Sequence, residues 1–153
     1  MNIFVLDYDH EKNAQYHCNR HVVKMVTEQT QLLCSAYYFT DSVPEGIYKL
    51  THANHPCAKW ARESLSNWLW LRDDTLALCK EYTYRYGKHH KCEAICDGLP
   101  APHIDDIWLT PFALAMPEQY RCSDAVEAYR SYYNGEKQHL FQWKNRQIPE
   151  WIK

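Results

Sequence analysis

Four side chains that could take part in acid–base or amine chemistry lie close together near the N-terminus: His17, His21, Lys24 and Glu28. Steps of four, three and four residues place them on one face of an α-helix. Two histidines four residues apart can bind a divalent metal. A lysine beside them would repel that ion, so the set favours acid–base or amine chemistry. The plain alternative is a solvated helix face.

A second polar cluster occupies residues 51–60, THANHPCAKW, just before a predicted helix that begins near Pro56. The free N–H groups at the start of a helix attract anions. His55 could therefore hold a phosphate or an oxyanion, with Asn54 beside it and Arg62 one to two turns along. The plain alternative is a loop in which Asn54 caps the helix.

A metal site remains an open alternative, because His52 and His55 could join His17 and His21 as ligands. The chain contains no HExxH motif, no paired Cys-x-x-Cys and no carboxylate-rich cluster that would support such a site. We therefore predict neither a metal nor another cofactor, and keep a histidine-ligated enzyme as an alternative.

The third cluster, KEYTYRYGKHHK at residues 80–91, interleaves basic residues with tyrosines. Aromatic rings stack on unpaired bases and basic groups contact phosphates. We expect Tyr84, Arg85, Lys88 and His89 to contact nucleic acid. The alternative is a wet helix end where basic residues oppose the helix dipole.

Two long helical patterns must position these clusters. The first runs from about Asp9 or Glu11 to Tyr38, and the second from Pro56 toward Gly87 with a break near RDDT at residues 72–75. The apolar segment NIFVL at residues 2–6 predicts a short strand or an extended tail laid on the core.

Shorter helices are expected in the second half of the chain. One covers Lys88 to Asp97, and another runs from a Ser123 cap through Tyr133. Asn134 and Gly135 are expected to end it, and a further helix covers residues 136–144. With only four glycines in the chain, the pattern predicts a mostly helical fold.

Composition limits the class of protein. The 153 residues carry a net charge of −2 and are 46% hydrophobic, which is typical of one globular domain spanning 1–153. That charge is not typical of a protein that wraps nucleic acid, although a local basic groove is compatible with it. Seven cysteines, an odd number, and the lack of a signal peptide or a long apolar run indicate a soluble protein with reduced thiols and no membrane partner. We expect it in the cytoplasm of a bacterial or phage-infected cell.

The first 90 residues resemble the pyrimidine dimer DNA glycosylase family, small helical proteins related to phage endonuclease V. The matching features are MNIFVL, the helix segment NRHVVKMVTE, NHPCAKW, and a helix that ends in CKEYTYRYG. The resemblance implies an all-α, single compact domain with an extended N-terminal segment. It also implies a glycosylase with lyase activity: a primary amine attacks C1′ of a flipped nucleotide, the base leaves, and a Schiff base to the sugar remains.

The resemblance also implies roles for individual residues. Glu28 is the carboxylate that assists the sugar chemistry, and the amine belongs to Met1 or to Lys24. His17 and His21 orient the substrate or contact its backbone, and His21 is also grouped with the catalytic residues. His55 and Asn54 lie across the pocket.

Two departures from the family pattern matter. Asn2 is large, and initiator methionine is usually removed only before small residues, so the α-amine is expected to belong to Met1. The slightly acidic net charge leaves room for modified bases, single strands or nucleotides.

The leading hypothesis is a DNA glycosylase, with or without lyase activity, that excises a damaged or modified pyrimidine in DNA repair or in phage biology. Its partner is DNA, either a duplex with a flipped base or a single strand. The alternatives are a non-catalytic nucleotide or nucleic-acid binder of phage or defence type, and the metal-dependent enzyme described above.

Overall fold

The computed structural model describes residues 1–153 and is all-helical, as the sequence predicts: 54% of residues lie in helices and none in strands. The six α-helices are α1 (His10–Tyr16), α2 (Asn19–Ala36), α3 (Pro56–Glu63), α4 (Leu65–Tyr86), α5 (Glu93–Gly98) and α6 (Ala125–Glu136). Three short 3₁₀ turns, η1 (Tyr37–Phe39), η2 (Glu118–Tyr120) and η3 (Gln138–Leu140), complete the fold. None of these helices has the length and apolar character that crossing a lipid bilayer requires.

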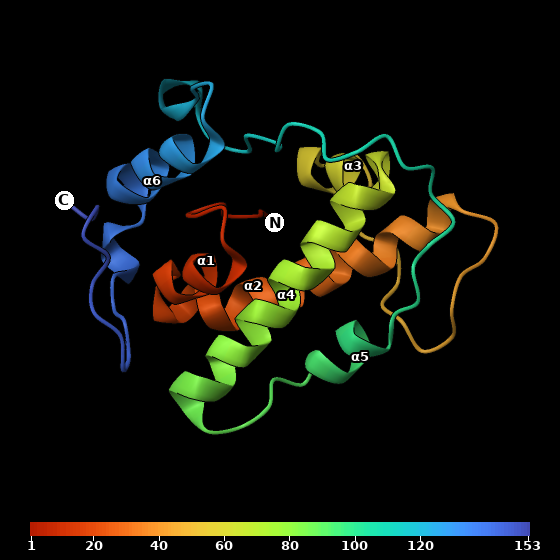
Figure 1. Ribbon diagram of the computed structural model, residues 1–153, viewed down its shortest axis with the longest axis horizontal. Helices are drawn as coiled ribbons and strands as arrows, with labels where there is room; N and C mark the ends of the chain where they lie inside the picture. The colour runs from red at the N-terminus through yellow and green to blue at the C-terminus, as the bar shows by residue number, and fades with distance from the viewer.

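The core forms where α4 crosses α2, with α3 packed against both helices and α1 packed against α4 (Figure 1). Leu33 of α2 and Trp68, Leu71 and Leu78 of α4 are fully buried there. Each such side chain contributes roughly 1.5–3 kcal/mol through burial. The Trp68 indole N–H donates to the carbonyl of Leu33 at 3.1 Å, so the one polar atom of that ring is satisfied.

Residues 2–6 form a buried extended tail rather than a strand. Side chains from elsewhere satisfy its backbone. The Leu6 N–H donates to Asn13 Oδ1 at 2.7 Å, and Arg130 Nε donates to the Leu6 carbonyl at 2.8 Å. Phe4 packs edge-to-face on Tyr133 of α6, which is itself fully buried. The tail therefore lies in the middle of the molecule, with α6 beyond it (Figure 1), and this fixes the position of Met1.

The first long helix is interrupted, contrary to the prediction of one helix from Asp9 or Glu11 to Tyr38. His17 and Cys18 are both extended, with ψ of 133° and 160°, and they separate α1 from α2. Both side chains are fully buried, and His17 Nδ1 lies 2.6 Å from the Asn13 carbonyl. Tertiary burial outweighs the local helical pattern, so His17 does not share a helix with Lys24 and Glu28.

The second long helix also breaks, but at Ser64 rather than near RDDT. Ser64 is extended (φ −148°, ψ 145°), and the Leu65 N–H donates to the Asp105 carbonyl at 3.1 Å. The Ser64 hydroxyl donates to Asp106 at 3.0 Å. A loop distant in sequence thus supplies the hydrogen bonds that a break in a helix would otherwise leave unmade. The RDDT segment continues as regular helix in α4.

The C-terminal third differs from the sequence prediction in several boundaries. Asp124, not Ser123, caps α6 by accepting from two backbone N–H groups. Asn134 and Gly135 lie inside α6, and of the helix expected over residues 136–144 only the last residue of α6, Glu136, and the turn η3 are helical. The helix predicted over residues 88–97 is shorter and begins later, as α5.

Candidate functional site

Glu28 lies between two amines. One carboxylate oxygen, Oε2, is 3.7 Å from the α-amine of Met1, and the other, Oε1, is 3.8 Å from Nζ of Lys24. The Glu28 side chain is 14% exposed and that of Met1 only 3%, whereas Lys24 is 63% exposed. The structure thus brings together three residues that the sequence analysis placed in the catalytic set.

The buried tail holds the α-amine in place. The Asn2 side chain donates to the Ala115 carbonyl at 2.9 Å and accepts from the Tyr129 hydroxyl at 3.1 Å. These bonds tie the second residue to segments over a hundred positions away in the chain. The amine is therefore presented to Glu28 from a fixed backbone rather than from a free end.

His55 is close to the same pair. Burial lowers its pKa, the Met1 amine and His52 lower it further, and Glu28 acts in the opposite direction. Its Nδ1 accepts from the Cys57 N–H at 3.1 Å, so His55 itself caps α3 in place of Asn54. A neutral His55 consequently carries its proton on Nε2, where it can donate to an oxygen atom.

A groove of about 1020 Å³ runs along the exposed side of α2. Its other walls come from the end of α4, the segment before α5, and Gln142. Glu28 and Lys24 line it, together with Lys88 and His89. Two of the predicted nucleic-acid contacts therefore lie in the same groove as two of the predicted catalytic residues.

The two histidines of the opening cluster face the interior. His21 stacks on Phe4 at 4.5 Å, and its Nδ1 lies 2.5 Å from the Tyr133 hydroxyl. Burial, followed by the nearby charge of His17, lowers its pKa to about 3. His17 is fully buried, and its Nε2 has no hydrogen-bond partner. The structure brings neither ring into the groove.

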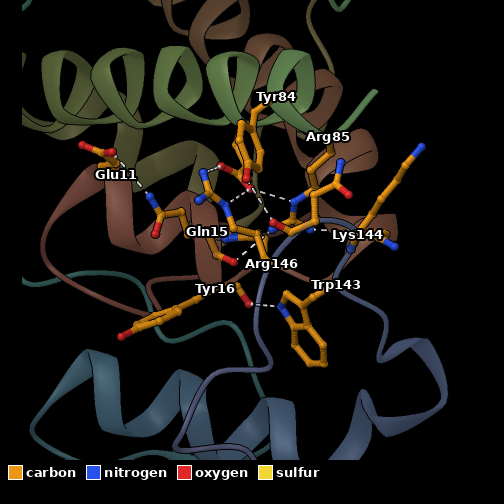
Figure 2. A network of polar contacts seen from close by, with 12 residues as sticks. Glu11, Gln15, Tyr16, Tyr84, Arg85, Trp143, Lys144 and Arg146 are labelled. Atoms are coloured by element: carbon orange, nitrogen blue, oxygen red, sulfur yellow. Dashed lines mark hydrogen bonds and ion pairs between the residues drawn. The ribbon is translucent and has the colours of Figure 1, made fainter. Parts of the chain in front are cut away.

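Tyr84 and Arg85 belong to a polar network on another side of α4 (Figure 2). Arg85 is buried and donates to Glu81 at 2.7 Å, and the Arg146 guanidinium lies 3.9 Å from the centre of the Tyr84 ring. The Tyr84 hydroxyl donates to the Asn145 carbonyl at 3.2 Å. These contacts join the C-terminal segment to α4, and neither residue lines the groove.

The remaining predicted contacts lie apart from the groove. Asn54 is exposed on the loop before α3. The Arg62 guanidinium lies 3.9 Å from the centre of the Phe39 ring and lines a separate hollow with Lys59 and Pro111. The structure thus places these two residues outside the groove that holds Glu28.

The ligand set of the metal alternative is not formed. No three His, Cys, Asp or Glu side chains in the chain lie in an arrangement that could hold a metal ion. His17 and His21 are buried among aromatic rings, whereas His52 is exposed with its Nδ1 2.6 Å from the Thr51 hydroxyl.

Sequence reasoning missed part of the groove. Arg20, Lys91, Tyr82 and Tyr86 also line it. A signal for the first was present, because Arg20, Lys24 and Glu28 follow each other at steps of four residues. The sequence prediction centred instead on His21, which lies on the neighbouring stripe of α2 that faces the core.

Compared with protein-family models, curated proteins and solved structures, the chain matches none.

Proposed function

We propose that the protein is a DNA glycosylase that excises a damaged or modified pyrimidine through an amine nucleophile, with Glu28 as its acid–base group. The observation that carries the proposal is the position of Glu28, with one oxygen near the Met1 amine and the other near Lys24, at the wall of a basic groove. The resemblance of residues 1–90 to pyrimidine dimer DNA glycosylases supports the same chemistry.

The arrangement suits covalent catalysis. An amine freed of its proton donates its lone pair to C1′ of an extruded nucleotide, and the glycosidic bond breaks with its electrons going to the base. Glu28 accepts a proton from the amine and stabilises positive charge on the sugar. Opening of the sugar ring then leaves a Schiff base, which water hydrolyses or β-elimination resolves.

Of the two amines, Lys24 lines the groove, whereas the α-amine of Met1 is buried beside Glu28 and is the more firmly held. The Met1 backbone is held by Asn2, whereas Lys24 is largely exposed on a flexible stem. His55, close to the same amine, supplies a donor for a sugar or phosphate oxygen.

The test is borohydride trapping on oligonucleotides that carry a panel of damaged and modified pyrimidines. We expect a covalent adduct with the wild type, and peptide mapping of the adduct identifies Met1 or Lys24 as the amine. Glu28→Gln should lose about 10²–10⁴-fold in single-turnover rate, the usual contribution of acid–base catalysis. The matched control is Glu45→Gln, an exposed loop carboxylate with no ion-pair partner.

Two results would count against the proposal. One is the absence of any adduct or released base across the panel. The other is a folded Glu28→Gln variant whose rate stays within twofold of the wild type, which would refute the role of Glu28 even if the activity were real.

A non-catalytic nucleotide or nucleic-acid binder is the second candidate, because the groove and its cations can bind a ligand without any chemistry. Recovery of chemically unaltered ligand from a tight complex, with no base release, would favour it.

A further inference from the structure

The groove along α2 holds more positive charge than the rest of the chain would suggest. Arg20, Lys24, Lys88 and Lys91 line it, and Glu28 is the one carboxylate among its lining residues. Lys24 pairs with Glu28, whereas Arg20, Lys88 and Lys91 have no carboxylate partner. Four cations against one carboxylate leave a local charge of +3 in a chain whose net charge is −2. Such a groove attracts a polyanion.

One wall of the groove is aromatic. The rings of Tyr82 and Tyr86, one turn apart on α4, lie 5.1 Å from each other. The ammonium group of Lys144 lies 5.2 Å from the centre of the Tyr86 ring. Tyrosines beside unpaired cations provide stacking surfaces for bases next to contacts for phosphates.

The length of the groove and its tyrosines favour a short unpaired strand. The lining residues of α2 extend from Asn19 to Gln31, a rise of ~18 Å at 1.5 Å per residue. In a duplex the faces of the bases are stacked on one another, so Tyr82 and Tyr86 can stack only on unpaired bases. At about 3.4 Å per nucleotide of stacked strand, ~18 Å accommodates roughly five nucleotides.

We infer that this groove binds an unpaired nucleic-acid strand of about five nucleotides, with phosphates on Arg20, Lys88 and Lys91 and bases against Tyr82 and Tyr86. The inference deepens the proposed function and rests on it, because the strand that occupies the groove carries the nucleotide presented to Glu28. Unpaired substrate also avoids the cost of breaking a base pair before extrusion.

The experiment measures binding without catalysis. Fluorescence anisotropy with the full chain compares a labelled, unmodified ten-nucleotide single strand with the matching blunt duplex, over about 25–200 mM salt. We expect at least tenfold tighter binding of the single strand. Three free cations predict a slope of log K against log salt near −2, at about −0.7 per phosphate contacted.

Variants test the residues. Lys88→Ala with Lys91→Ala, both exposed, should weaken binding and reduce the salt slope toward about −0.7. Tyr86→Leu should weaken binding about tenfold, as expected for the loss of one stacked base. Lys12→Ala, an exposed lysine outside the groove, is the matched control and should change affinity less than twofold. Thermal melting of each variant verifies that it is folded.

Each outcome supports or overturns the inference. Equal or tighter binding of the duplex, no binding at low salt, or a folded double lysine variant with unchanged slope overturns it. Base release from duplex without a preference for the single strand would keep the proposed function and overturn this inference. Tight strand binding without any base release would support this inference and count against the proposed function.

Discussion

Replacing Glu81 with glutamine should lower the free energy of unfolding substantially, although the two side chains have nearly the same shape. Glu81 is 4% exposed and accepts from Arg85 at 2.7 Å and from Arg146 at 2.9 Å. The Arg85 side chain has no exposed surface, and its other bonds go to Asn19 and to the Gln15 carbonyl. Glu81→Gln keeps the shape of the side chain but leaves the Arg85 charge buried without a counter-ion.

The magnitude follows from that burial. Removing one partner of a buried ion pair typically costs about 3–5 kcal/mol, because the remaining charge stays desolvated. The Arg146 pair is partly exposed (27% for its side chain) and adds less than about 1 kcal/mol. The Gln amide oxygen still accepts one hydrogen bond, so we expect a loss of about 3–4 kcal/mol in the free energy of unfolding. For a chain of this size that lowers Tm by roughly 6–16 °C.

The assay is urea unfolding followed by tryptophan fluorescence, with wild type and variant compared at equal m-value. Glu11→Gln is the matched control: its carboxylate is exposed, and its side chain makes one 3.4 Å hydrogen bond with Gln15. We expect the control within about 0.5 kcal/mol of wild type. A Glu81→Gln loss below about 1 kcal/mol, with m unchanged, would refute the view that Arg85 depends on this carboxylate.

Three further predictions concern stability. Gly87 ends α4 at φ 69° with open space around it, so Gly87→Ala should cost about 1–2 kcal/mol of unfolding free energy from backbone strain alone. Gly98 has a negative φ, so Gly98→Ala should be neutral or stabilising. Equal effects of the two substitutions in urea unfolding would contradict this. The pKa of His21 is lowered to about 3, so its contribution to stability is present above pH 6.5 and is lost below it at about 1.4 kcal/mol per pH unit. The free energy of unfolding of His21→Gln should therefore fall less steeply with decreasing pH than that of the wild type. An unchanged slope would argue against a buried neutral ring. The pKa of His10 is raised, chiefly by its hydrogen bond to Asp74, so the contribution of this pair to stability is present below pH 6.5 and is lost as pH rises through the raised pKa. The difference in unfolding free energy between wild type and His10→Gln should therefore shrink from pH 5.5 to pH 8.5. A constant difference would refute the pairing.

The class of fold could be predicted from local patterns. Apolar residues at helical spacing, Pro56 at a helix start and Gly87 at a helix end are short-range signals, and the structure has helices at these places. The breaks at His17 and at Ser64 carried no such signal. At Ser64 the reason is a hydrogen-bonding loop about 40 residues away, which no local window contains.

The candidate site also contains both contacts that local spacing predicts and contacts that depend on residues distant in the sequence. Lys24 and Glu28 are one helical turn apart, so their contact could be predicted from spacing alone. The approach of the Met1 amine depends on a tail held by residues more than a hundred positions away.

The sequence by itself determined the helical class, the chemical types available and which residues of α2 can be neighbours, because these depend on short-range periodicity. Only the tertiary structure decided which side of α2 faces solvent. Phe4 and Tyr133 hold His21 in the core, and Arg20 and Lys24, on the adjoining side of the helix, line the groove, with Glu28 at the boundary between the two sides. A helical stripe fixes relative positions on one cylinder, whereas its orientation is set by what packs against that cylinder.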